Sequence, residues 1–540
     1  MIVNKSMYPL QTSFGVISKM QDKFATLQMQ LGTGEKSSTL AGMGRDLPLS
    51  LSVRSRLDKI EGYSANIETV NLRLSFLDKT LTRFDKLEGE ARNAAIQGQY
   101  GTGGINMATL PGLSKARFDE IVTMLNEDVA GRYLFGGTAT DKAPLRDTET
   151  LLNGAGGKYG FKRVSELRAK ADGVDDAHKL GRLQLPTPAS DTVSLSEDGD
   201  HVFGLKLSNA TTTASSSAIV ITPPDVNASP ATLNVQFVGQ PTPGQSIAIG
   251  LTLPDGNETQ VTLTASSDSS SAPGSFLVSD DLDEMAANFA AALKTGLEVV
   301  TQTELKAGST FAAANDFFNE SGIPKLPLGD PATELEDDTT GLAIRWYTGD
   351  TAANPRATVS SNIDDTARVN YGMQANESGF LRLIRSQAAL AISEYPSEEA
   401  VRSKDMYEDL RLAAMALPEG ADRDVKLAEY NAAVTADYRL STGFFDGMAK
   451  RQQSELSESH NTETGSIEII TMEIGLAQGT LQSATTRHTD YKAQLDNLLS
   501  DIETVSKEDV AMEILALQTR LQASFQTTAM VSQLSLVNFL

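Results

Sequence analysis

The residue types that most often perform chemistry are sparse in this sequence. The four histidines, His178, His201, His460 and His488, lie far apart, and none is four residues from another, the spacing that lets two side chains on one helix face bind a metal. There is no cysteine, which excludes thiolate ligands, cysteine nucleophiles and disulfides. Nothing in the residue order selects the partners of a Ser–His–Asp triad. We therefore expect no metal, no cofactor and no catalytic residue.

Two further patterns fall short of a binding site. Residues 154–158 (GAGGK) contain the glycines and lysine of a phosphate-binding loop but not the GxxxxGK[ST] spacing, and Tyr159 follows where Ser or Thr would hold magnesium. The carboxylates of residues 280–284 and 334–338 do not have the spacing of a calcium-binding loop. We predict a flexible loop for the first pattern and solvated charge for the others. The protein is expected not to be an enzyme.

Composition and charge exclude two classes of partner. The chain has 540 residues and a formal net charge of −24, whereas nucleic-acid binding requires clustered cations. No run of about 18 apolar residues could form a membrane span. The opening residues MIVNKS are not followed by the apolar stretch of a secretory signal peptide. We expect no nucleic-acid partner and no membrane partner, and an extracellular location would require export without a cleaved signal peptide.

The N-terminal residues carry an apolar stripe with helical spacing. An apolar side chain recurs every three or four positions from residue 7 to 31, at Met7, Leu10, Phe14, Ile17, Met20, Phe24, Leu27 and Leu31. This heptad-like pattern predicts an amphipathic helix, and Pro9 limits where that helix begins. The stripe suits either an ordinary core helix or a coiled-coil partner for a second stripe.

A matching stripe lies near the C-terminus. Ser506 is followed three residues later by Asp509, a capping-box pattern that predicts a helix start. Apolar residues with helical spacing come next, at Ile514, Leu517, Leu521 and Phe525, and further ones close the sequence, at Leu534, Leu536, Phe539 and Leu540. An apolar stripe has to be buried. We expect the two stripes to be buried together on assembly, with both ends largely disordered in the free monomer.

The centre of the chain differs in composition from its ends. Short apolar alternations predict strands at residues 218–221, 233–238 and 246–253, and Pro254, Asp255 and Gly256 predict a hairpin turn after the last. A helix is predicted at 283–297. Other predicted elements are helices at 49–97, 114–129, 376–393, 423–458 and 463–499, and a hairpin formed by 343–347 and 357–359.

These elements predict an α+β multi-domain fold. Residues 1–150 and 336–540 would form the two halves of a long antiparallel helical rod, made by N- and C-terminal coiled-coil segments. Residues 151–335 would form an inserted β-rich outer domain. The hairpin at 343–347 and 357–359 would lead from that insert back to the rod.

A specific motif follows the third predicted helix. Residues 131–137 have the sequence GRYLFGG, and the same run follows the third helix in the flagellin family, which this sequence resembles. The matched residues are Gly131, Arg132, Tyr133, Leu134, Phe135, Gly136 and Gly137. Residues 31–36 resemble the family's turn after the first helix, with Glu35 inserted before the lysine. Residues 369–372 and 375–380 resemble the segment that starts its returning helices, so the resemblance covers roughly the first 150 and last 200 residues.

The resemblance implies a structural subunit of the bacterial flagellum. The terminal helices would pair into an axial core, with the insert facing outwards, and the apolar residues of both stripes from Phe14 onward would form the assembly interface. Implied partners are other flagellar axial proteins (hook-associated proteins and flagellin), the export apparatus and a chaperone, with homo-oligomers in the extracellular assembled state. Residues 534–540 look more like the hook-associated members than the filament flagellins. A different class remains open, a secreted surface-binding or adhesin protein acting through the insert.

Overall fold

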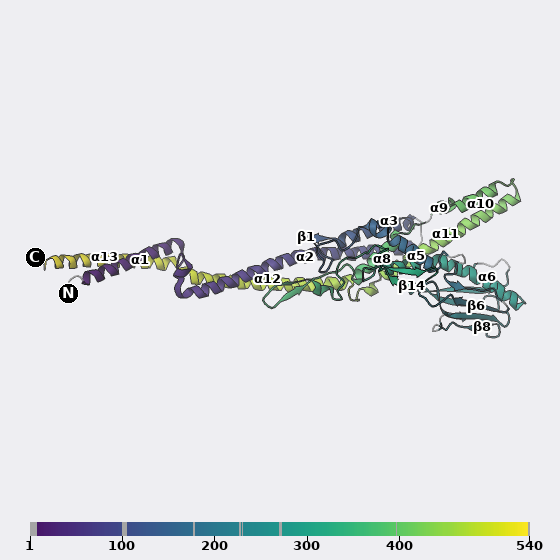
Figure 1. Cartoon of the computed structure of the whole chain (residues 1–540), viewed down its shortest axis with the longest axis horizontal. Coiled ribbons are helices and arrows are strands. Elements are labelled where there is room, and N and C mark those ends of the chain that lie inside the picture. The colour runs from purple at the N-terminus through teal and green to yellow at the C-terminus, as the bar shows by residue number, and fades with distance from the viewer. Residues whose placement is uncertain are drawn as a thin grey trace. The chain divides into compact units, whose positions relative to one another are not determined.

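The computed structural model has a mixed α+β fold with long helices and small sheets (Figure 1). It describes residues 8–99, 105–175, 179–188, 190–225, 228, 230–268, 273–395 and 397–537. The chain forms two compact units. Unit 1 comprises Met1–Leu72, Ser361–Val369 and Ala477–Leu540, and unit 2 comprises Arg73–Ser360 and Asn370–Leu476. The expected division at residues 150 and 335 stays a prediction.

Unit 1 is built from helices near the two ends of the sequence. It contains α1 (Tyr8–Thr33), the short helix η1 (Leu40–Asp46), the first part of α2 (Leu47–Gln99), the later part of α12 (Ile467–Glu503) and α13 (Lys507–Val537). Helices α1 and α13 lie side by side (Figure 1). The apolar periodicities thus predicted α1, α2, α12 and the start of α13 to within a few residues, whereas η1 was not predicted.

The hairpin expected after the insert lies at a different position. Strands β15 (Ser360–Asn362) and β16 (Arg368–Asn370) form a two-stranded sheet, whereas residues 343–347 form no strand. Ala343 and Tyr347 make only single β-bridges, to Tyr159 and Leu145. The prediction of a strand was wrong because the composition of this run reflects burial and not strand pairing. Ala343, Trp346 and Tyr347 are buried in unit 2, and this tertiary packing outweighs the strand-like composition.

Helices form much of unit 2. They are α3 (Ile105–Leu125), α4 (Thr148–Asn153), α5 (Phe161–Ala171), α7 (Lys306–Phe317), α8 (Ser378–Ala391), α9 (Glu398–Arg402), α10 (Asp405–Met415) and α11 (Ala421–Glu455), with short turns η3 (Pro355–Thr358) and η4 (Glu458–His460). The third predicted helix begins earlier than residue 114 and ends at Leu125. Helices α4, α5, α7, α9 and α10 were not predicted from the sequence.

Two four-stranded sheets and one helix share the largest core of unit 2. One sheet has the order β5 (Leu183–Gln184), β6 (Thr192–Glu197), β9 (Thr232–Phe237), β8 (Ile219–Thr222); the other has β12 (Ser275–Leu277), β11 (Glu258–Ser266), β10 (Ser246–Thr252), β7 (Lys206–Thr212). Helix α6 (Leu282–Val300) packs against both and contributes Phe289 to their common core. The three predicted strands and the turn between β10 and β11 are confirmed.

Helix α6 continues without a break into α7. A single π-helical turn, η2 (Thr301–Leu305), joins them, so the helix predicted to end at Leu297 reaches Phe317. Leu297 and Leu305 belong to the core of the sheets, whereas Ala307 and Phe311 belong to a second core with α3, α8 and α11. The continuous helix therefore connects the two cores. The smaller strand pairs are β1 (Asp128–Val129) with β2 (Arg132–Tyr133), β3 (Gly154–Ala155) with β4 (Lys158–Tyr159), and β13 (Lys325–Gly329) with β14 (Ala332–Asp337).

Candidate assembly interface

The two terminal stripes meet in unit 1. Leu27 of α1 is buried together with Val510, Ile514 and Leu517 of α13. Half-buried side chains extend the contact along both helices: Met20, Phe24, Val505 and Leu521. Outside this apolar line, Lys23 Nζ lies 2.5 Å from Glu513 Oε1 in an exposed ion pair. The spacing that placed each stripe on one helix face is therefore what allows the two faces to contact each other.

The turns next to these helices hold the pair in register. The Val505 N–H donates to the Gly34 carbonyl (2.9 Å), and the Lys36 N–H donates to the Glu503 carbonyl (2.7 Å). Gly34 has a φ of +80°, which a residue with a side chain rarely adopts. The Asp509 N–H donates to Ser506 Oγ at 3.3 Å, so α13 begins where the capping pattern predicts. These bonds connect the segment after α1 to the segment before α13.

A second contact joins α2 to α12 within unit 1. Its buried residues are Val53, Leu57, Ile60, Leu495 and Ile502. Beside them, Arg54 donates twice to the Glu503 carboxylate, at 2.9 and 2.6 Å, and Ser50 Oγ donates to it at 2.5 Å. The hydrogen bonds from Arg54 lower the pKa of Glu503, because they stabilise its charged form.

The predicted interface residues whose exposure the structure describes fall into three groups. Ile17, Leu27, Ile514 and Leu517 are buried, and Met20, Phe24 and Leu521 are half-buried. Phe14, Leu31 and Phe525 are exposed. Leu534 and Leu536 lie in α13, and Phe539 and Leu540 lie outside the described residues. The chain therefore brings the centres of both stripes together and leaves other members of each stripe uncovered.

A second set of apolar residues lies on the same helices and was not among the predicted interface residues. Met512 and Leu515 of α13 are 62% and 64% exposed. Leu515 directly follows the buried Ile514 in the sequence, and Met512 precedes it by two positions. Val16, Met530 and Val531 are also exposed. An apolar residue directly adjoining the stripe, such as Leu515 beside Ile514, was the available signal that α13 is apolar on more than one face. These side chains leave apolar surface of α1 and α13 uncovered within the chain.

The family-like motif begins with a tight hairpin in unit 2. Strands β1 and β2 pair as Asp128 with Tyr133 and Val129 with Arg132. The two residues between them, Ala130 and Gly131, have φ values of +56° and +74°. Positive φ at both central positions is typical of the type I′ turn, whose twist matches that of the strands. The first glycine of the motif therefore serves a turn that needs its conformation.

The rest of the motif packs against the other segment that resembles the family. The Phe135 ring lies in one cluster with Phe84 and Phe380, at centroid distances of 6.2 and 5.5 Å. The Ala375 N–H donates to the Phe135 carbonyl, and the Gly137 N–H donates to the Met373 carbonyl, both at 2.9 Å. Residues 131–137 and 373–380, more than two hundred positions apart, thus form one packed junction.

The histidines have structural surroundings or lie outside the described residues. His201 contacts Asp198 Oδ1 at 2.7 Å, His460 contacts Glu463 Oε1 at 2.7 Å, and His488 donates to the Ile363 carbonyl at 2.7 Å. His178 is not among the described residues. In the part of the chain that the structure describes, no group of three or more His, Asp and Glu side chains could hold a metal ion.

Comparison with known proteins adds no relative. No protein-family model matches the chain, and no curated protein matches it. Among the described residues, no helix has the length and apolar character needed to cross a membrane.

Proposed function

We propose that this protein is a flagellin-like structural subunit of the bacterial flagellum that assembles through its paired terminal helices. The observation that carries the proposal is the α1–α13 pair, which buries part of each stripe within one chain and leaves Phe14, Leu515 and Phe525 uncovered. A polymer subunit needs such a surface, because its neighbours must bury apolar side chains that the monomer exposes. The junction of the two family-like segments in unit 2 supports the same assignment.

The uncovered side chains could supply the assembly energy. Complete burial of one large apolar side chain contributes about 1.5–3 kcal/mol, and several such residues occur on α1 and α13, namely Phe14, Val16, Met512, Leu515, Phe525, Met530 and Val531. Part of that energy is offset by the entropy of ordering the helices on association. Assembly is therefore expected to be cooperative and to depend on many neighbouring subunits.

Within this class we propose the hook–filament junction protein rather than the filament flagellin. The support is the resemblance of residues 534–540 (LSLVNFL) to hook-associated members of the family. The partners would be hook-associated proteins and flagellin in the extracellular filament, and a chaperone and the export apparatus before assembly. Immunogold labelling separates the two roles: a single spot at the hook end supports the junction, and labelling along the filament supports flagellin.

Assembly is tested with substitutions that leave the α1–α13 contact unchanged. Met512→Glu with Leu515→Glu adds charge to exposed positions of α13, so the monomer should fold normally. Co-sedimentation with flagellar axial proteins should then be lost, as it should on deletion of residues 506–540. Gln518→Glu, also exposed on α13, is the matched control and should assemble. Normal assembly of the double variant would contradict the proposal.

A further inference from the structure

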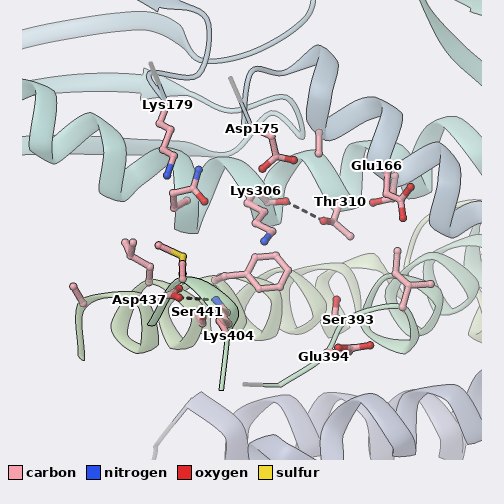
Figure 2. A pocket seen from close by; sticks show the side chains of 18 of the residues that line it. Glu166, Asp175, Lys179, Lys306, Thr310, Ser393, Glu394, Lys404, Asp437 and Ser441 are labelled. Carbon is pink, nitrogen blue, oxygen red and sulfur yellow. Dashed lines mark hydrogen bonds and ion pairs between the residues drawn. The ribbon is translucent and has the colours of Figure 1, made fainter. Parts of the chain in front are cut away.

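A groove of about 830 Å³ lies in unit 2, far along the sequence from the terminal stripes. One wall comes from α5, α7 and the residues Asp175 and Lys179. The other comes from α11, the first turn of α10 and the segments before α9 and α10 (Figure 2). The Phe444 side chain of α11 also lines the groove. The groove is within the size range of small-molecule sites, about 300–1,000 Å³.

Lysine side chains gather on one wall of the groove. Lys162, Lys179 and Lys306 line it, and Figure 2 shows the ammonium groups of Lys179 and Lys306 directed into it. Lys306 Nζ lies 5.1 Å from the centre of the Phe444 ring, a cation–π contact that positions the ammonium. In the described part of the chain, neither Lys162 nor Lys306 forms an ion pair with a carboxylate. Both ammonium groups can therefore donate charge-assisted hydrogen bonds to an anionic group of a ligand.

Two of the four carboxylates at the groove already have cationic partners. Glu166 Oε2 lies 2.8 Å from Arg163 Nη1, and Asp437 Oδ2 lies 2.5 Å from Lys404 Nζ and accepts from the Tyr407 hydroxyl at 3.1 Å. The other two, Asp175 and Glu394, are exposed acceptors.

The ligand must therefore satisfy ammonium groups and carboxylates in the same groove. A carboxylate-bearing sugar does so, because its carboxylates can accept from lysines while its hydroxyls donate to Asp175, Glu394 and the hydroxyl oxygen of Ser441. A polyphosphate lacks the hydroxyl donors that could hydrogen-bond to the two carboxylates, and a neutral sugar would leave the ammonium groups without new partners. Two or three sugar rings would occupy the groove.

We propose that this groove binds an acidic oligosaccharide, a short chain of uronic acid units, with Lys306 and Lys162 holding its carboxylates. Such a site would give an assembled subunit a contact with carboxylated surface polysaccharide. It is independent of the terminal helices, so binding can be measured on the unassembled full-length chain.

The probe is trigalacturonic acid, titrated into the full-length protein by calorimetry. Saturable binding is expected, weakening as salt rises because exposed charges are screened. Lys306→Gln removes one charge-assisted hydrogen bond and should weaken binding about ten-fold. Lys294→Gln, an exposed lysine of α6 outside the groove, is the matched control and should bind as the unsubstituted protein does.

Three outcomes would overturn the proposal. They are no saturable binding of trigalacturonic acid, equal binding of the neutral sugar maltotriose, and unchanged affinity in Lys306→Gln. Because Lys306 is exposed, its substitution leaves the core intact, and an unchanged thermal unfolding midpoint would show that weaker binding does not reflect misfolding.

Discussion

Arg451 of α11 joins three segments of unit 2 through a nearly buried guanidinium. Its Nε lies 2.5 Å from Asp255 Oδ2 in the turn between β10 and β11, and its Nη1 lies 2.9 Å from Glu304 Oε2 in the π-helical turn η2. Its Nη2 also donates to the Glu304 carbonyl at 3.1 Å. The side chains of Arg451 and Asp255 are 5% and 4% exposed. Their ion pair connects the sheets to the helical core.

Replacing Arg451 by Met should destabilise unit 2 by about 3–5 kcal/mol, because the Asp255 carboxylate would stay buried without its partner. Glu304 is about one-quarter exposed and can be hydrated, so it contributes less to this cost. Adding Asp255→Ala removes the stranded charge and should restore at least half of the loss. The double-mutant cycle then gives the coupling energy between the two side chains.

The measurement is urea unfolding followed by tryptophan fluorescence. Trp346 is the only tryptophan of the chain and is buried in unit 2, so its emission reports on this unit. Arg163→Met is the control, because Arg163 forms an exposed pair with Glu166 that should contribute less than about 1 kcal/mol. A loss below about 1 kcal/mol for Arg451→Met, or a double variant no more stable than the single one, would refute the reasoning.

Three other perturbations test separate features. Burial, and to a smaller extent the charge of the neighbouring Glu468, raises the pKa of Glu88 to about 7. The folded state therefore binds this proton more tightly than the unfolded state. As a result, the free energy of unfolding should fall by about 1–2 kcal/mol as pH rises from about 5 to 8. Glu88→Gln should abolish that dependence in urea titrations, and an unchanged slope would exclude this carboxyl as its source. Leu517→Ala should destabilise the α1–α13 contact by about 2–3 kcal/mol, which should appear as faster hydrogen exchange in α13 but not in α5. If the amides of α13 were as protected in the variant as in the unsubstituted protein, the helix pair would not depend on the stripe. Ala130→Gly should stabilise the β1–β2 turn by about 0.5 kcal/mol, and a lower thermal unfolding midpoint would argue against strain at its positive φ.

Local signals predicted much of the helical part of the fold. The stripes that contain Leu27 and Leu517 repeat with helical spacing, and Ser506 caps the helix that follows it, so the residues themselves define those elements. The turn at Asp255 and Gly256 was equally clear, because each residue type favours a particular backbone conformation.

Features that depend on distant contacts could not be predicted in the same way. The run at Trp346 resembles a strand by composition, yet its position is set by the side chains that bury it. No breaker or cap distinguishes the π-helical turn between α6 and α7. Lys162 and Lys306 line one groove although 144 positions separate them (306 minus 162), and the exposure of Leu515 depends on how α13 packs. No sequence spacing encodes the proximity of the two lysines or the exposure of Leu515.

The α1–α13 contact also constrains the order in which the chain can fold. Lys23 and Glu513 are 490 positions apart, and closing a flexible loop of that length costs about 3.5 kcal/mol more than closing one of about ten residues. The cost falls once unit 2 has formed, because that unit already brings Glu88 and Glu468 within electrostatic reach of each other. The terminal pair should therefore be the last contact to form during folding. Until then, each stripe would also be available to another subunit in the proposed assembly.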